Sequence, residues 1–147
     1  MDLSPAEYRA LAQFRYQIRR YLHFSEEQAR RYGLEPQQHQ LLLAIKGLPE
    51  DVQPTIGELA GRMQLKHHSM VELVDRLENH GYVTRISGRD DRRQVIVHLS
   101  RAGSRVLHQL SVAHRNELDT AGPALSAALR SLRKTRPTAS ERPGRVA

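Results

Sequence analysis

The fold is decided by one segment that has the pattern of two short strands joined by a charged tip: Arg85-Ile86-Ser87-Gly88-Arg89-Asp90-Asp91-Arg92-Arg93-Gln94-Val95-Ile96-Val97-His98-Leu99. Its second half alternates, which predicts Val95, Val97 and Leu99 on one face and Gln94, Ile96 and His98 on the other. The tip, residues 89–93, holds three arginines and two aspartates. A tight turn needs only glycine and small polar residues to close, so the arginines require another role. Insertion into the narrow, negative minor groove of DNA is one such role.

The net charge of the chain, +7, is distributed unevenly. Residues 130–147 carry +5 of it, so the overall charge mainly describes the C-terminal end. Residues 84–105 carry six arginines and two aspartates, a local excess centred on the charged tip. Position therefore supports nucleic-acid binding better than total charge does.

Several classes of function are excluded by what the sequence lacks. The chain has 147 residues and no cysteine, which excludes disulfides, thiolate catalysis and cysteine-ligated metal. It has no P-loop, dinucleotide fingerprint or nucleophile elbow, so we expect no enzyme and no cofactor. The eight histidines show no pair at metal-ligand spacing, so we expect no metal site. No apolar window could span a membrane and no signal peptide precedes the first helix, which predicts a cytoplasmic protein.

Four helices are predicted before the hairpin. Ser4-Pro5-Ala6-Glu7 is a capping box that opens a helix to about Arg31. A second helix spans about 36–47, and Thr55-Ile56-Gly57-Glu58 is a second capping box that opens a short helix ending at Met63. The fourth runs from about His67 to His80. Its buried stripe is predicted to be Met70, Leu73, Val74 and Leu77. The short helix and the fourth helix, joined by a tight turn, form a helix-turn-helix pattern. The hairpin follows, with strands predicted over 82–86 and 94–99.

A long last helix is predicted to begin after the capping residue Ser100. Gly122-Pro123 is expected to interrupt it, with a short final helix over 124–133. We divide the chain into an N-terminal dimerisation helix (1–34), a winged helix-turn-helix region (35–99), C-terminal dimerisation helices (100–134) and a disordered basic tail (135–147).

A helix-turn-helix followed by a hairpin is the winged-helix arrangement, and over about residues 5–133 the chain resembles the MarR family of bacterial transcriptional regulators. The resemblance is carried by four runs in order: Leu73-Val74-Asp75-Arg76-Leu77-Glu78, Gly81-Tyr82-Val83, Asp90-Asp91-Arg92-Arg93, and Val97-His98-Leu99-Ser100 with Gly103. It implies a mainly α fold with a small β-hairpin wing, and a homodimer in which the first and last helices of two chains intertwine. The six aromatic residues between 8 and 32 fit such an interface.

The resemblance also implies that the fourth helix enters the major groove of a pseudo-palindromic operator while the hairpin reaches the minor groove. Asp91 and Arg93 fill the family's Asp-x-Arg motif, with Arg93 in the minor groove and Asp91 orienting the neighbouring arginines. Arg89 and Arg92 would contact phosphate or the groove.

The start of the fourth helix departs from the usual family pattern of Asp or Ser-Thr. Lys66 is a poor N-cap but a good phosphate contact. His67, His68 and Ser69 would reach base edges. Glu72 would accept from cytosine or pair with Arg76.

The resemblance further implies repression that a small ligand relieves, often an aromatic or phenolic acid. The ligand would lodge between the dimer helices and the DNA-reading region. The residues expected to line its pocket are Tyr16, Arg20, Tyr21, Phe24, His39 and Leu43. Two alternatives stay open: a winged-helix module that binds a protein, which would not need the wing arginines, and a metal-responsive regulator.

Overall fold

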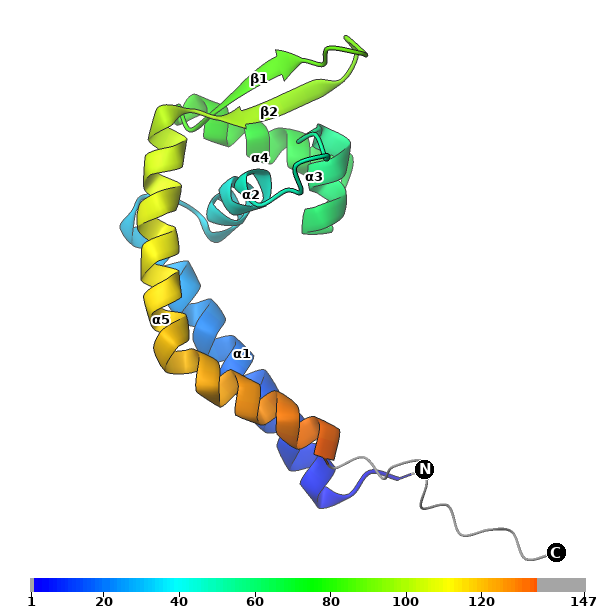
Figure 1. The fold of residues 1–147 in the computed structure, drawn as a ribbon, viewed down its shortest axis with the longest axis vertical. Helices are drawn as coiled ribbons and strands as arrows, with labels where there is room; N and C mark the ends of the chain where they lie inside the picture. Colours follow the sequence, from blue (N-terminus) through cyan, green and yellow to red (C-terminus); the bar gives the residue numbers. More distant parts are fainter. Residues whose placement is uncertain (1, 135–147) are drawn as a thin grey trace, which may run out of the picture. The chain divides into compact units, whose positions relative to one another are not determined.

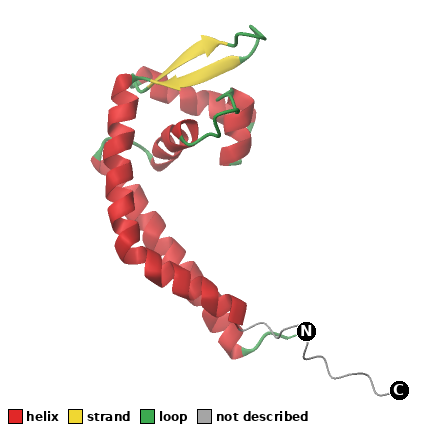
Figure 2. Ribbon diagram, in the orientation of Figure 1, coloured by secondary structure: helices red, strands yellow, loops and turns green. Residues whose placement is uncertain are grey.

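The computed structural model describes residues 2–134 and is mainly helical with one β-hairpin (Figures 1 and 2). The elements follow in the order α1 (Pro5–Arg31), α2 (Pro36–Lys46), α3 (Ile56–Met63), α4 (His67–Asn79), β1 (Val83–Ser87), β2 (Val95–Leu99) and α5 (Arg101–Lys134). The predicted fold class is confirmed, and each predicted boundary up to the hairpin is right to within about one residue. The predicted disordered tail, 135–147, lies outside the described residues. None of the helices in residues 2–134 combines the length and apolar character needed to cross a membrane.

The chain forms two compact units. Residues 25–113 contain α2, α3, α4, the hairpin, the end of α1 and the beginning of α5. The second unit joins the rest of α1 to the rest of α5.

The core of the 25–113 unit lies between α2, α3, α4, the hairpin and the first turns of α5. The predicted stripe of α4 is confirmed, because Met70, Leu73, Val74 and Leu77 are all buried. The centre of this cluster also includes buried side chains from the other elements: Leu41 and Leu42 of α2, Leu59 of α3, Val97 of β2, and Leu107 and Leu110 of α5. Burying each such side chain stabilises the fold by about 1.5–3 kcal/mol.

The helix starts have local causes. Glu7 N donates to Ser4 Oγ over 3.2 Å and Ser4 N donates to Glu7 Oε2 over 2.6 Å, so the first predicted capping box is present. The second is only half formed. Glu58 N donates to Thr55 Oγ1 over 3.1 Å, but the Glu58 carboxylate pairs with Arg62 instead of returning to Thr55.

A tight turn joins α3 to α4. Gln64 ends α3 in the left-handed region, with φ 55°, and Leu65 N returns to the Ala60 carbonyl over 2.9 Å. Few residues other than glycine and asparagine adopt this conformation readily. The turn fixes the direction in which α4 leaves α3 and completes the helix-turn-helix.

The hairpin is antiparallel, with Val83 opposite Leu99 and Ser87 opposite Val95. Ile96 and Val97, which the sequence places on opposite faces of β2, are both buried. The chain before α3 pairs with this strand: Val97 N donates to the Pro54 carbonyl over 2.9 Å, and Thr55 forms a bridge with Ile96. The middle of β2 is therefore enclosed rather than open to water on one face.

A close joint connects the start of α5 to the end of α4. Ser100 Oγ accepts a hydrogen bond from Gly103 N (3.0 Å) and donates one to the Gly81 carbonyl (2.6 Å). Ser100 N donates to the Tyr82 carbonyl over 3.0 Å. A Cβ on Gly103 would lie 2.0 Å from that same carbonyl oxygen, so only glycine fits there. The run Ser100-x-x-Gly103 is thus explained by this joint, which needs the Ser100 hydroxyl and leaves no room for a side chain at position 103.

The predicted interruption of α5 is wrong, because α5 is continuous through Pro123. A proline removes one hydrogen bond, here the bond to the Asp119 carbonyl, and crowds the preceding turn. Its neighbours 124–129 are mostly alanine and leucine, which are strong helix formers, and Ala128 is buried. These contributions outweigh the local cost.

Candidate nucleic-acid interface

The start of α4 is exposed and lacks a side-chain cap. Lys66 occupies the N-cap position with extended backbone, and its side chain accepts no hydrogen bond from the helix. Lys66, His67 and His68 are exposed, whereas Ser69 is half-buried. The residues predicted to contact bases therefore lie together at the N-terminus of α4. The N-cap side chain there accepts no hydrogen bond from the first backbone amides of the helix.

The exposed face of α4 carries more acid than base. Glu72, Asp75, Arg76 and Glu78 are all exposed. No ion pair joins Glu72 to Arg76 in the described part of the chain, so the helix alone does not neutralise these carboxylates. These carboxylates would repel the phosphates of DNA unless a nearby cation neutralises them.

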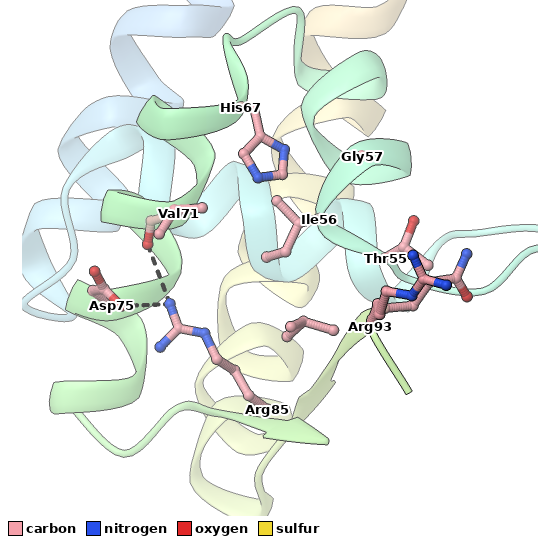
Figure 3. Close-up of a pocket in the computed structure, with 10 residues that line it drawn as sticks. Thr55, Ile56, Gly57, His67, Val71, Asp75, Arg85 and Arg93 are labelled. Atoms are coloured by element: carbon pink, nitrogen blue, oxygen red, sulfur yellow. Dashed lines mark hydrogen bonds and ion pairs between the residues drawn. The ribbon is translucent and has the colours of Figure 1, made fainter. Parts of the chain in front are cut away.

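Arg85 of β1 pairs with two of these carboxylates, a role that the sequence did not predict. Its Nη1 donates to Glu78 Oε1 over 3.1 Å. Its Nη2 donates to Asp75 Oδ1 and also to the Val71 carbonyl, the latter over 3.3 Å (Figure 3). Its side chain is only 27% exposed. The one sequence signal was the spacing of Asp75 and Glu78, which are three residues apart and so share a helix face.

The wing tip presents arginines to solvent. The Arg93 side chain is 96% exposed, and its Nε lies 3.9 Å from Asp91 Oδ1. Asp91 accepts a hydrogen bond from Arg93 N over 2.9 Å, which shapes the turn. Arg89 and Arg92 are exposed and form no ion pair within residues 2–134. The tip thus carries cationic side chains whose charge is largely unneutralised.

A cleft of about 570 Å³ separates α4 from the wing. Figure 3 shows the His67 ring at one side of the cleft, Thr55 and Arg93 at another, and Arg85 reaching from β1 to α4. Its apolar lining comes from Ile56, Val71 and Val95. The start of α4 and the wing tip are therefore two projections with open space between them.

This chain is similar to known proteins in sequence and in fold. The sequence profile of the MarR family matches residues 32–94, which span the helix-turn-helix and reach the wing tip. This part of the chain is therefore similar to the MarR family. An uncharacterised HTH-type transcriptional regulator of Bacillus subtilis, YsmB, is 33% identical over 79 residues; the match covers 54% of this chain and about half, 52%, of that relative's length.

Two solved structures have the same fold as this chain. AbsC, a MarR family transcriptional regulator from Streptomyces coelicolor, is 20% identical, with a TM-score of 0.74 and 91% of each chain covered. A variant of MarR from E. coli, solved in complex with operator DNA, is 19% identical, with a TM-score of 0.64, 84% of this chain and 90% of that chain covered.

The residues expected to line a ligand pocket fall in both units. In the unit that contains most of α1, the Arg20 guanidinium lies 5.8 Å from the centre of the Tyr16 ring. Tyr21 and Phe24 present their rings edge-on to His114, with centroids 6.1 and 5.5 Å away. Burial raises the pKa of the Tyr21 hydroxyl.

The other two expected pocket residues lie in the 25–113 unit. His39 is 2% exposed, within the interior. Leu43 is exposed and lines a cavity of about 300 Å³ between α2 and α5, together with Lys46 and His108. Among residues 2–134, no three histidine, aspartate or glutamate side chains stand close enough to hold a metal ion.

Proposed function

We propose that this chain is a homodimeric, sequence-specific DNA-binding regulator that places α4 in the major groove and the wing tip in the adjacent minor groove of each operator half-site. The observation that carries the proposal is the 96% exposed Arg93, on a hairpin beside the uncapped start of α4. Arginine is suited to the narrow minor groove, and an exposed helix start is suited to the major groove. The complex of the E. coli relative with operator DNA supports this assignment.

The proposed dimer is supported by apolar side chains left exposed on the α1–α5 unit. Tyr8 is 61% exposed and Tyr16 is 51% exposed, which is unusual for large aromatic side chains. Leu3, Leu11, Leu22, Leu118 and Leu129 are also exposed there. A second copy of the chain would cover this surface, and two copies would match a pseudo-palindromic operator. Sedimentation equilibrium that gives a monomer at micromolar concentration would contradict the dimer.

The proposed regulation is repression that a small aromatic or phenolic ligand relieves. Arg20 and Tyr16, already stacked, could hold the carboxylate and the ring of such a ligand. The ligand must bind better to the arrangement that does not fit the operator, and a ten-fold loss of DNA affinity requires about 1.4 kcal/mol of coupling. Calorimetric titration with salicylate as the probe, with Arg20→Ala as the comparison, tests the idea. Equal affinity of the wild type and Arg20→Ala for salicylate would refute the assignment of these residues to the pocket.

The DNA-binding proposal is tested with Arg93→Ala. Loss of a groove contact should weaken binding to a selected duplex by about 1–3 kcal/mol, roughly ten-fold or more, while the protein stays folded. Arg115→Ala is the matched control, because Arg115 is exposed on α5 outside the helix-turn-helix and wing. Fluorescence anisotropy against salt concentration provides the measurement. Affinity that does not change with Arg93→Ala refutes the wing assignment.

Base reading and phosphate contact are separated by two further variants. His68→Ala should change the ranking of duplex sequences, whereas Lys66→Ala should weaken all sequences alike. A flat salt dependence of the wild-type protein would instead favour the protein-binding alternative, because phosphate contacts release counterions. Binding that disappears with chelator and returns with zinc would favour the metal-responsive alternative.

A further inference from the structure

Arg85 joins the wing to α4 through a polar clamp. The guanidinium reaches three acceptors within one stretch of α4, namely the Val71 carbonyl and the carboxylates of Asp75 and Glu78. A planar guanidinium has a fixed fork of donors, so satisfying several acceptors also fixes direction. The clamp therefore constrains the orientation of β1 relative to α4.

The charge of Arg85 is not available for phosphate. Two carboxylates surround one guanidinium, and its side chain is 27% exposed, compared with 96% for Arg93. The clamp also neutralises part of the acidic face of α4. Arg85 and Arg93 lie on the same hairpin but have different environments, and only the latter is free to enter a groove.

The clamp matters because it joins β1 directly to the exposed face of α4, whereas the backbone contacts in the middle of β2 are made with the segment before α3. The hairpin is anchored in the core by Val83 and Val97 and is bonded to Pro54 and Thr55, and the cleft of about 570 Å³ lies between the wing and α4. Arg85 lines this cleft, on the strand that leads from the core to the tip. The clamp therefore adds a direct constraint on the distance between β1 and α4 across this cleft.

We propose that Arg85 is a positioning residue for sequence reading: by clamping β1 to Asp75, Glu78 and the Val71 carbonyl, it sets the distance between the start of α4 and the wing tip to that of neighbouring grooves in one half-site. The proposal rests on the proposed DNA-binding function. It predicts that loss of the clamp reduces discrimination between sequences, independently of the charge that is removed.

Three variants separate position from charge. Arg85→Gln removes the clamp and one positive charge. Asp75→Asn with Glu78→Gln weakens the clamp and leaves Arg85 free, so binding to unrelated DNA should strengthen and the salt slope should steepen by about one unit. The triple variant with all three changes removes the clamp with no charged group left at the site. Arg105→Gln, at an exposed α5 residue without an ion pair in the described part of the chain, controls for charge alone.

The measured quantity is the ratio of dissociation constants for a scrambled duplex and for a duplex of about 24 base pairs selected by the wild-type protein, enough for two half-sites one turn apart. We expect this ratio to fall about ten-fold in Arg85→Gln, in the double variant and in the triple variant, and to be unchanged in Arg105→Gln. Arg85→Lys, which keeps the charge but loses the fork, should recover only part of the ratio. A triple variant with the wild-type ratio would overturn the proposal, since charge alone would then explain Arg85.

A measurement without DNA makes the test independent of the proposed function. Amide hydrogen exchange of peptides covering 83–99 should be faster in Arg85→Gln and in the triple variant, with α2 peptides unchanged. Unchanged exchange over 83–99 refutes the clamp even if DNA binding is affected. A wild-type protein that shows no salt-dependent duplex binding contradicts the proposed function instead, and the exchange data still decide whether Arg85 holds the wing.

Discussion

Replacement of Gly103 by alanine tests the joint between α5 and the end of α4. The added Cβ would lie 2.0 Å from the Tyr82 carbonyl oxygen and 3.0 Å from the carbonyl carbon, both of which are backbone atoms that cannot rotate away. Overpacking of this kind costs about 1–3 kcal/mol. Displacement of the Tyr82 carbonyl also weakens its hydrogen bond from Ser100 N, worth about 1 kcal/mol. Alanine regains up to about 1 kcal/mol of helix propensity, which leaves a net loss of about 2 kcal/mol.

Gly61→Ala is the matched control for Gly103→Ala, because nothing lies within 4 Å of a Cβ at Gly61 of α3. That change should stabilise the protein by about 0.5–1 kcal/mol. Thermal unfolding followed by circular dichroism, at one fixed protein concentration, should show Gly103→Ala melting roughly 4–8 °C lower and Gly61→Ala slightly higher. A Gly103→Ala protein as stable as the wild type would refute the steric account of the joint.

Three further predictions concern stability. Ser100→Ala removes the cap of α5 and the bond to the Gly81 carbonyl, and urea unfolding should show a loss of about 1–2 kcal/mol; a loss below about 0.3 kcal/mol would contradict the capping role. Leu41→Ala, in the fully buried core, should cost about 2–5 kcal/mol in the same assay, and a near-neutral result would mean that the core is misassigned. Hydrogen bonds from Ser4 lower the pKa of Glu7, so its stabilisation is present above the ordinary carboxylate pKa and is lost as pH falls through the folded value. The melting difference between wild type and Glu7→Gln should therefore vanish in acid, and a difference that persists there would exclude this linkage.

Sequence patterns predicted those parts of the fold that depend on neighbouring residues. The stripe of α4 follows from apolar residues three and four positions apart, and the first capping box from Ser4 and Glu7 alone. The interruption at Pro123 was wrong because the helix-forming residues around it outweigh a single proline. The burial of Ile96 was missed because the segment that pairs with β2 lies far back in the chain.

In the candidate site, too, the sequence predicted what depends on neighbouring residues and missed what depends on tertiary contacts. Arginines gathered on a turn are visible in the sequence, and Arg93 is indeed exposed at the tip. The role of Arg85 was not predictable in this way, because it depends on ion pairs with Asp75 and Glu78 of α4. No local sequence pattern connects Arg85 with these two residues. The lining of a cleft and the distance between two projections are properties of tertiary packing, which periodicity does not encode.

The proline within α5 has a consequence for assembly. A helical segment as short as 123–134 is at the lower limit of what persists in water without tertiary contacts, about 12–15 residues, and the missing bond at Pro123 weakens its connection to the preceding turns. Leu129, within this segment, is 48% exposed and has its side chain available for a partner surface. In a homodimer the end of α5 would therefore gain order from the second chain. The helix content of the protein would then depend on its concentration, and dilution would melt this end first.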